Sequence, residues 1–439
     1  MKDGQLASEH LKWSRVKREL EKSWPIGEQL KSNKAENLFA WIGNCIAEVV
    51  QDACTAWPGQ LPATLSLGVT FSFPMEQHTL SHATLMSMGK GFALESRLDL
   101  GKQLLHGYDL ARDSSLPKIT IAAIANDAVA TLVGFAYQFR KNPRRKAAMG
   151  LIVGTGCNAT IPLALSKLHP TKRPATVEVL NNSEAERDPK IAVNTEWTIK
   201  GAAGPLRELG FVTGWDTKLD QEGEAPGFQP FEYMTAGRYL GELGRIIIVD
   251  YFTNYLGIPV YDLPLRLRER HRLTTTFLGN LGSHLAVKEP SMLKQLEAEL
   301  PPTESAIAFR WTEESAAIVF KIAKAIELRA AAMVAAAIVA LLACADEIDL
   351  TASSSVLTSL TNGIVKATSK ESVAELMVGY TGGCIVHFQD YLEDCQVFLD
   401  ELMHLSRNKQ RVVLKPCHDG GIIGAGILAG TVQNISHVT

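Results

Sequence analysis

The sequence predicts an α/β protein of two lobes that close over a central cleft. Three segments support this fold class, because each runs from an apolar stretch of strand length into a glycine-rich turn: residues 147–158, 375–383 and 411–430. Long helical segments separate them, and no short-period repeat is present, which excludes a solenoid. In α/β folds of this kind, ligands bind at the carboxyl ends of the strands, where such turns lie.

The remaining elements follow in chain order. The first 60 residues read as helical, with apolar residues at a spacing of three to four, and a β-rich run follows at 66–74. Residues 118–126 form a strand that leads into a helix over 127–139. A polar loop at 180–190 precedes a long helical tract from about 230 to 345.

Composition and charge exclude several classes of protein. The 439 residues carry a net charge of −3, whereas nucleic-acid binding needs a clustered positive excess. The seven cysteines are scattered and contain no CxxC pair, so we expect a reducing compartment and neither a disulfide framework nor a metal site. The N-terminal segment has no signal-peptide core, and we expect a cytoplasmic protein.

One segment, 330–345, is apolar enough to raise the question of a membrane span. Its 16 uncharged residues fall short of the ~20 that span a bilayer. It is also rich in alanine, which lets neighbouring backbones approach closely. We therefore expect a buried interior helix and no membrane partner.

The glycine turns are candidates for phosphate binding, because they present backbone N–H groups to an anion. The residues in question are Gly154, Thr155, Gly156, Gly382, Gly383, Asp419, Gly420 and Gly421. A dinucleotide fold built on Gly424 and Gly426 is disfavoured, since too few residues follow for its second strand. The P-loop pattern GxxxxGK[ST] is absent.

Several segments resemble the eukaryotic hexokinase family in order and spacing. They are LGVTFSFPMEQHTLSHATLMSMGKGF (67–92), IAAIANDAVATLVGFAY (121–137), MGLIVGTGCNATI (149–161), VNTEW (193–197), FEYMTAGRYLGELGR (231–245) and HDGGIIGAGILAG (418–430). The resemblance covers roughly residues 20–432. It implies the actin-like sugar-kinase fold, with a small lobe at 1–125, completed by about 416–439, and a large lobe at 126–415.

The resemblance also implies a set of site residues. Asp127 matches the general base that acts on the sugar 6-hydroxyl. The residues that match hexose contacts are Ser72, Lys90, Asn126, Asp127, Asn158, Glu196 and Glu232. Carboxylates and amides suit a sugar, because each of its hydroxyls both donates and accepts hydrogen bonds. Each residue also has a purely structural alternative. Asp127 could be a helix N-cap, and Glu232 could be an acidic residue in the first turn of a helix, where the helix dipole favours it.

The departures from the family pattern concern the nucleotide. The strand–turn–strand that carries DLGGTNFR is missing, so we expect the sheet of the large lobe to be incomplete. The family's threonine before Lys90 is Gly89, and the two C-terminal nucleotide turns read Thr381-Gly382-Gly383 and His418-Asp419-Gly420-Gly421. This mixture resembles divergent hexokinase-like proteins of filamentous fungi. A chain start that is assigned too late would also explain the missing hairpin.

Two functions are therefore consistent with the sequence. One is an enzyme that phosphorylates a hexose at its 6-hydroxyl, with ATP and Mg²⁺ as cofactors. The other is a catalytically weak or inactive hexose-binding regulator. In either case we expect a hexose as ligand, no nucleic acid or membrane partner, and a monomer or homodimer.

Overall fold

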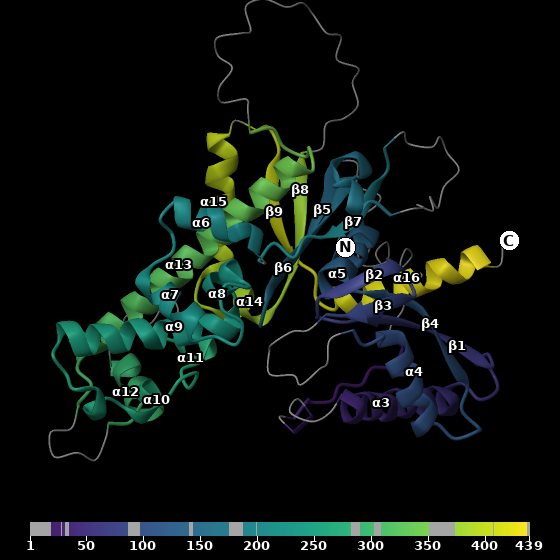
Figure 1. Ribbon diagram of the computed structural model, residues 1–439, viewed down its shortest axis with the longest axis horizontal. Coiled ribbons are helices and arrows are strands. Elements are labelled where there is room, and N and C mark those ends of the chain that lie inside the picture. Colours follow the sequence, from purple (N-terminus) through teal and green to yellow (C-terminus); the bar gives the residue numbers. More distant parts are fainter. Residues whose placement is uncertain are drawn as a thin grey trace, which may run out of the picture. The chain divides into compact units, whose positions relative to one another are not determined.

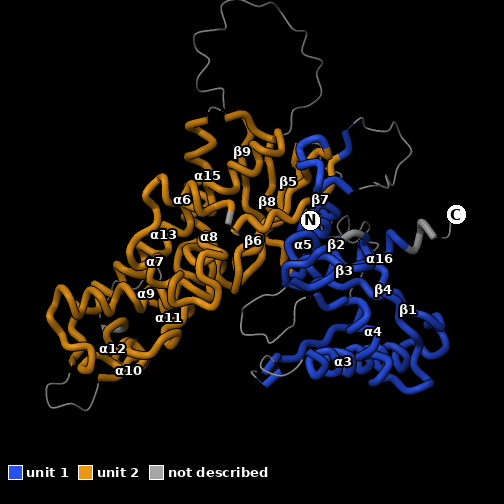
Figure 2. The backbone as a smooth tube through the Cα atoms, viewed as in Figure 1, with its two compact units in different colours: residues 1–140, 166–189, 419–439 blue, residues 141–165, 190–418 orange. Residues whose placement is uncertain are grey.

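The computed structural model describes residues 19–27, 29–30, 35–86, 97–139, 144–174, 188–198, 200–281, 290–302, 309–350, 374–406 and 408–436. The chain divides into two compact units (Figure 2). Unit 1 contains residues 1–140, 166–189 and 419–439, and unit 2 contains residues 141–165 and 190–418. The polar loop expected at 180–190 lies mostly outside the described residues.

Unit 1 is built on two parallel strands, which are β1 and β4, and the β2–β3 hairpin (Figure 1). Helices α3 and α4 pack on each other, and α5 packs on α16. The bounds are α3 Ala35–Ala56, β1 Thr64–Thr70, β2 Met75–Thr79, β3 His82–Leu85, α4 Leu100–Ala111, β4 Lys118–Ala125, α5 Asp127–Phe139 and α16 Gly420–Ser436.

Glycines set how closely the helices of unit 1 approach. A Cβ added to Gly424 of α16 would lie 1.9 Å from the carbonyl oxygen of Ala130 in α5, a distance that no real side chain tolerates. This packing groups α5 with α16, so the first boundary between the units falls after residue 140 and differs from the expected boundary at 125.

Unit 2 is built on a five-stranded sheet in the order β7-β6-β5-β8-β9. Strands β5, β6 and β7 form an antiparallel meander, whereas β8 and β9 run parallel to β5. The strand bounds are β5 Arg145–Val153, β6 Cys157–Ala164, β7 Lys190–Asn194, β8 Glu375–Thr381 and β9 Arg411–Pro416. An incomplete sheet in the large lobe stays a prediction; among the described residues the five-stranded sheet belongs to unit 2 and the two-stranded sheets to unit 1.

The helices of unit 2 share its single large core with this sheet. Their bounds are α6 Ala203–Glu208, α7 Gly214–Gln221, α8 Pro230–Thr235, α9 Gly237–Asp250, α10 Leu265–Arg268, α11 Thr275–Gly279, α12 Pro290–Glu299, α13 Glu313–Cys344, α14 Gly383–His387 and α15 Tyr391–Leu405. A π-helical turn, Tyr251–Tyr255, continues α9.

Helix α13 contains the apolar segment 330–345. Among the described residues it is the one helix that is long and apolar enough to cross a membrane, judged by length and composition alone. However, 56% of its most apolar 18-residue stretch is buried inside the protein. The side chains of Ala331, Val334, Ala335 and Ile338 are fully buried. This is the packing of a core helix, as expected for a buried interior helix.

Candidate functional site

Three of the predicted sugar contacts follow the two parallel strands of unit 1. Thr70 and Ala125 lie opposite each other at the ends of β1 and β4. Ser72 comes two residues after the first strand, and Asn126 and Asp127 come directly after the second. Because parallel strands end at the same edge of a sheet, the register places these side chains at one edge. Lys90 lies outside the described residues.

The cap of helix α5 is Asn126 and not Asp127. Asn126 is 6% exposed, and its Oδ1 accepts a hydrogen bond from the backbone N–H of Ala128 at 2.9 Å, as an N-cap side chain does. Asp127 is half-buried, and its Oδ1 accepts from the same N–H. Its Oδ2 has no hydrogen-bond partner among the described residues. The geometry therefore leaves this carboxylate oxygen available to a ligand.

The C-terminal glycine turn lies at the same edge of unit 1. A Cβ added to Gly421 would contact the side chain of Thr70, and one added to Gly134 in α5 would lie 2.8 Å from the carbonyl oxygen of Gly420. Asp419 has a φ of 59°, which turns the chain into α16. The structure thus places Asp419, Gly420 and Gly421 beside the strand end that leads to Ser72.

In unit 2, two predicted ring contacts meet through a third polar side chain. The Nδ2 group of Asn158, in β6, donates to Glu196 Oε1 at 3.1 Å and to Asn194 Oδ1 at 2.8 Å. The Nδ2 group of Asn194, the last residue of β7, donates to Glu196 Oε1 at 2.9 Å. All three residues are half-buried. They form a closed triangle of hydrogen bonds at the end of the β6–β7 pair.

Glu232 joins this cluster from helix α8. It is 3% exposed, and its Oε2 accepts a hydrogen bond from the backbone N–H of Cys157 at 3.0 Å. Asn158 is the next residue, so strand β6 brings the predicted ring contacts of unit 2 together. Burial raises the pKa of the Cys157 thiol to about 12, so this cysteine stays a neutral thiol beside the carboxylate.

The two glycine turns of unit 2 also lie against each other. Gly382 has a φ of 124°, and a Cβ there would lie 2.2 Å from the carbonyl oxygen of Val153, directly before Gly154. The carbonyls of Gly154 and Thr155 accept hydrogen bonds from the first N–H groups of α9. The N–H groups of Thr155 and Gly156 have no acceptor within the described part of the chain. Gly383 follows as the first residue of α14.

Asn194 belongs to this hydrogen-bonded cluster but was not among the residues predicted from the sequence. The signal was present, because Asn194 lies two residues before Glu196 in the VNTEW segment and ends a strand. What the sequence could not show is the register that sets Asn194 opposite Thr160 and so next to Asn158. Within the described residues, no group of three or more His, Cys, Asp or Glu side chains is placed to hold a metal ion.

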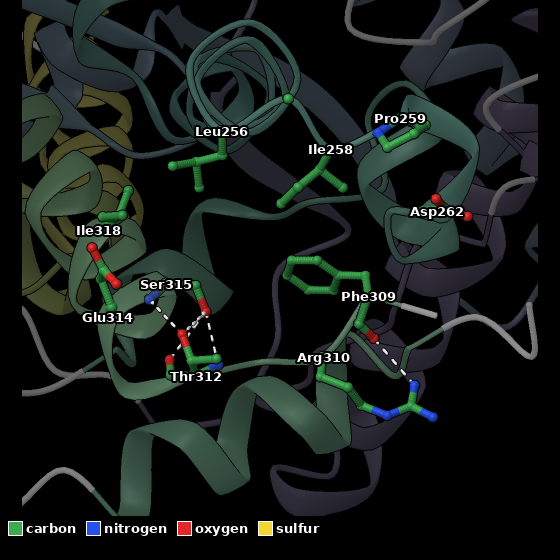
Figure 3. Close-up of a pocket in the computed structure, with 11 residues that line it drawn as sticks. Leu256, Ile258, Pro259, Asp262, Phe309, Arg310, Thr312, Glu314, Ser315 and Ile318 are labelled. Atoms are coloured by element: carbon green, nitrogen blue, oxygen red, sulfur yellow. Dashed lines mark hydrogen bonds between the residues drawn. The ribbon is translucent and has the colours of Figure 1, made fainter. Parts of the chain in front are cut away.

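A cavity of about 410 Å³ opens elsewhere in unit 2 (Figure 3). Apolar side chains that include Leu256, Ile258 and Phe309 frame it, and its polar residues Thr312 and Ser315 hydrogen-bond each other at the start of α13. None of the candidate sugar or nucleotide residues lines this cavity. The polar cluster around Asn158 therefore remains the candidate site of unit 2.

Comparison with family models gives a consistent match. A model described as hexokinase matches residues 148–431, which is more than half of the chain, and a second model with the same description matches residues 4–137. A hexokinase of Schistosoma mansoni is 32% identical over 268 residues, or 60% of this chain and 52% of that protein. A hexokinase of Emericella nidulans is 24% identical over 413 residues, or 93% of this chain and 73% of that protein.

Solved structures agree with these matches. A hexokinase from Schistosoma mansoni complexed with glucose has a TM-score of 0.71 and 26% identity, and the match covers 93% of this chain and 78% of that chain. A second hexokinase crystal structure has a TM-score of 0.62 at 22% identity. The fold is that of the two-lobed, actin-like sugar kinases. The sequence match to the first relative spans about half of that protein's length.

Proposed function

The chain belongs to the hexokinase family, and on this premise we propose that it transfers the γ-phosphoryl group of ATP to the 6-hydroxyl of a glucose-like hexose. The observation that carries the proposal is the polar cluster of unit 2, in which Asn158, Glu196 and Glu232 are brought together by strand β6. Two carboxylates and an amide recognise neighbouring hydroxyls of a sugar ring well, because each hydroxyl can donate to a carboxylate oxygen.

Asp127 supplies the base in this proposal. Its half-buried carboxylate is at the end of β4, and the capping role that competes for it is taken by Asn126. As the sugar O6 forms its bond to the γ-phosphorus, Asp127 accepts the hydroxyl proton, and the bond from that phosphorus to the β–γ bridging oxygen breaks to release ADP. Ser72 and Lys90 are proposed as additional hexose contacts, from the family resemblance alone.

The glycine turns are proposed to hold the nucleotide. In unit 2 the N–H groups of Thr155 and Gly156 suit phosphate oxygens, and Gly382 and Gly383 let the backbone approach closely. The turn at 419–421 is the corresponding proposal for unit 1. Mg²⁺ commonly binds through substrate phosphates with few protein ligands, so it is proposed to arrive with ATP and neutralise the charge on the transferred group.

The cellular location and the oligomeric state are proposed from the sequence alone. We propose a cytoplasmic protein, which the seven free cysteines support, since thiols persist where the compartment is reducing. A monomer or homodimer without a nucleic-acid or membrane partner stays our working description.

The experiment that tests the function pairs binding with turnover. Glucose titrated into the wild type should release heat, and ATP with Mg²⁺ should then give glucose 6-phosphate. Asp127→Ala should lower turnover at least 100-fold while glucose affinity stays within about tenfold, because the ring contacts remain. Asp109→Asn, at a side chain that is 63% exposed in the same unit, is the matched control and should behave as wild type.

Two results would contradict the proposal. A wild type that binds glucose but makes no sugar phosphate would instead be the hexose-binding regulator. If Asp127→Ala kept the wild-type rate, the base would have been assigned to the wrong residue.

A further inference from the structure

The side-chain amide of Asn194 connects two predicted sugar ligands. Its Oδ1 accepts from Asn158 and its Nδ2 donates to Glu196, at 2.8 and 2.9 Å. The polarity of this triangle is set by its carboxylate, because an ionised carboxylate only accepts hydrogen bonds. Both amides must therefore turn their nitrogens toward Glu196, and Asn194 is left with its oxygen facing Asn158.

The backbone at Glu196 needs such support. Its φ is 42°, in the left-handed region that a residue with a side chain adopts at a cost. The flanking Thr195 is held by two hydrogen bonds to the carbonyl oxygen of Ala159, from its backbone N–H at 3.0 Å and its hydroxyl at 2.8 Å. These bonds place the backbone turn, whereas Asn194 and Asn158 act directly on the carboxylate.

We infer that Asn194 is a positioning residue that aims Asn158 and Glu196 at the sugar, an inference that rests on the proposed function. In this role Asn194 acts through Asn158 and Glu196 and not through a contact of its own with the sugar. The two Nδ2 hydrogens of Asn158 are directed at Asn194 and Glu196, so what Asn158 and Glu196 offer a ligand is acceptor oxygens. The hydroxyls that they recognise must then act as donors.

The Asn194→Asp substitution tests this role with almost no change in shape. It replaces the donor facing Glu196 by an acceptor, so two carboxylates come within hydrogen-bonding distance. Such a pair holds a shared proton more tightly than a single carboxylate does, because the like charges raise its apparent pKa. We expect glucose affinity at pH 8 to fall at least tenfold and to recover several-fold at pH 5.5, where the shared proton restores a donor.

The control is an asparagine in a similar setting outside the cluster. Asn254 lies in the same unit, is exposed, and donates through Nδ2 to Asp250 Oδ1 at 2.6 Å. Asn254→Asp therefore also sets two carboxylates against each other. It should leave glucose affinity as in the wild type at both pH values. The control thus shows whether the effect needs the new charge at position 194 or follows from any added carboxylate in unit 2.

The outcomes separate the inference from the proposed function. If the wild type binds glucose and Asn194→Asp binds it equally well at pH 8, or loses affinity without recovery at pH 5.5, the positioning role is overturned and the function stands. If the wild type binds no hexose, both are overturned. Should Asn194→Asp be insoluble, Asn194→Ser removes the bridge without adding charge. A tenfold loss of affinity with an unchanged melting temperature supports the role, and unchanged affinity overturns it.

Discussion

The backbone N–H of Cys157 donates a hydrogen bond to the buried carboxylate of Glu232, at 3.0 Å. Helix α8 is thereby held to strand β6 one residue before Asn158. The bond uses Oε2 of Glu232, so the carboxylate has both a structural partner and a proposed ligand role. A substitution that keeps its shape but removes its charge can separate these two roles.

The first prediction is that Glu232→Gln folds but binds glucose 10- to 100-fold more weakly. The amide oxygen still accepts from Cys157, whereas the charge-assisted bond to a sugar hydroxyl is lost, at about 1.5–3 kcal/mol. Calorimetric titration gives the affinity and thermal unfolding gives the stability. A variant with wild-type affinity would show that Glu232 does not contact the ring.

The second prediction concerns the left-handed turn at Gly382. Gly382→Ala should lower the free energy of unfolding by more than about 3 kcal/mol, because its φ of 124° and the contact with Val153 both exclude a Cβ. Gly204→Ala is the matched control, since a Cβ there meets nothing within 4 Å and alanine favours helix α6. Denaturant unfolding measures the stability of both variants. Equal free energies of unfolding for the two variants would contradict the turn geometry.

The third prediction concerns an ion cluster between α13 and α15. The ammonium of Lys324 contacts the carboxylates of Glu327, Asp390 and Asp394, and Glu327 is fully buried. Lys324→Met should cost about 3–5 kcal/mol, because it leaves three carboxylates without their cation. Lys321→Met, at an exposed position of the same helix, should cost less than about 0.5 kcal/mol.

The fourth prediction is a pH dependence of stability from the same cluster. Burial raises the pKa of Glu327 to about 7, and the neighbouring Asp394 and Asp390 act in the same direction, against the opposing effect of Lys324. Between its ordinary pKa of 4.5 and 7, the folded protein therefore holds this proton more tightly than the unfolded chain. Stability should fall as the pH rises through that window, by about 3 kcal/mol at most.

Glu327→Gln should remove this slope, as measured by denaturant unfolding at pH 5 and pH 8. Glu347 is the control, because its pKa is shifted in the opposite direction. Burial pushes its pKa up, but hydrogen bonds from Lys146 and Lys190 outweigh burial and lower it. Its contribution is thus present above pH 4.5 and lost on acidification, so Glu347→Gln should destabilise at pH 7 and have little effect at acid pH. If Glu327→Gln kept the wild-type slope, another group would be responsible.

The sequence predicted the parts of the fold that depend on local pattern. The strand predicted within 118–126 is β4, Lys118–Ala125, and the strand predicted within 147–158 lies in β5, Arg145–Val153. The polar pair Asn126 and Asp127 follows β4, as predicted. Long-range contacts were not predictable in this way. Glu327 lies in an alanine-rich helix, and its ionic neighbours at 390 and 394 are more than 60 residues away in the chain. Asn194 likewise gains its role only from the register of β6 and β7.

The packing of α16 against α5, β1 and β4 has a consequence for biosynthesis. Residues 141–165 and 190–418 leave the ribosome before α16 does, so unit 2 has all its strands available while unit 1 still lacks the helix that covers its parallel pair. Strands β1 and β4 must wait, with an apolar face exposed, until residues 420–436 emerge. A chaperone that shields exposed apolar surface would therefore be needed longest by unit 1, which is completed only when α16 has been made.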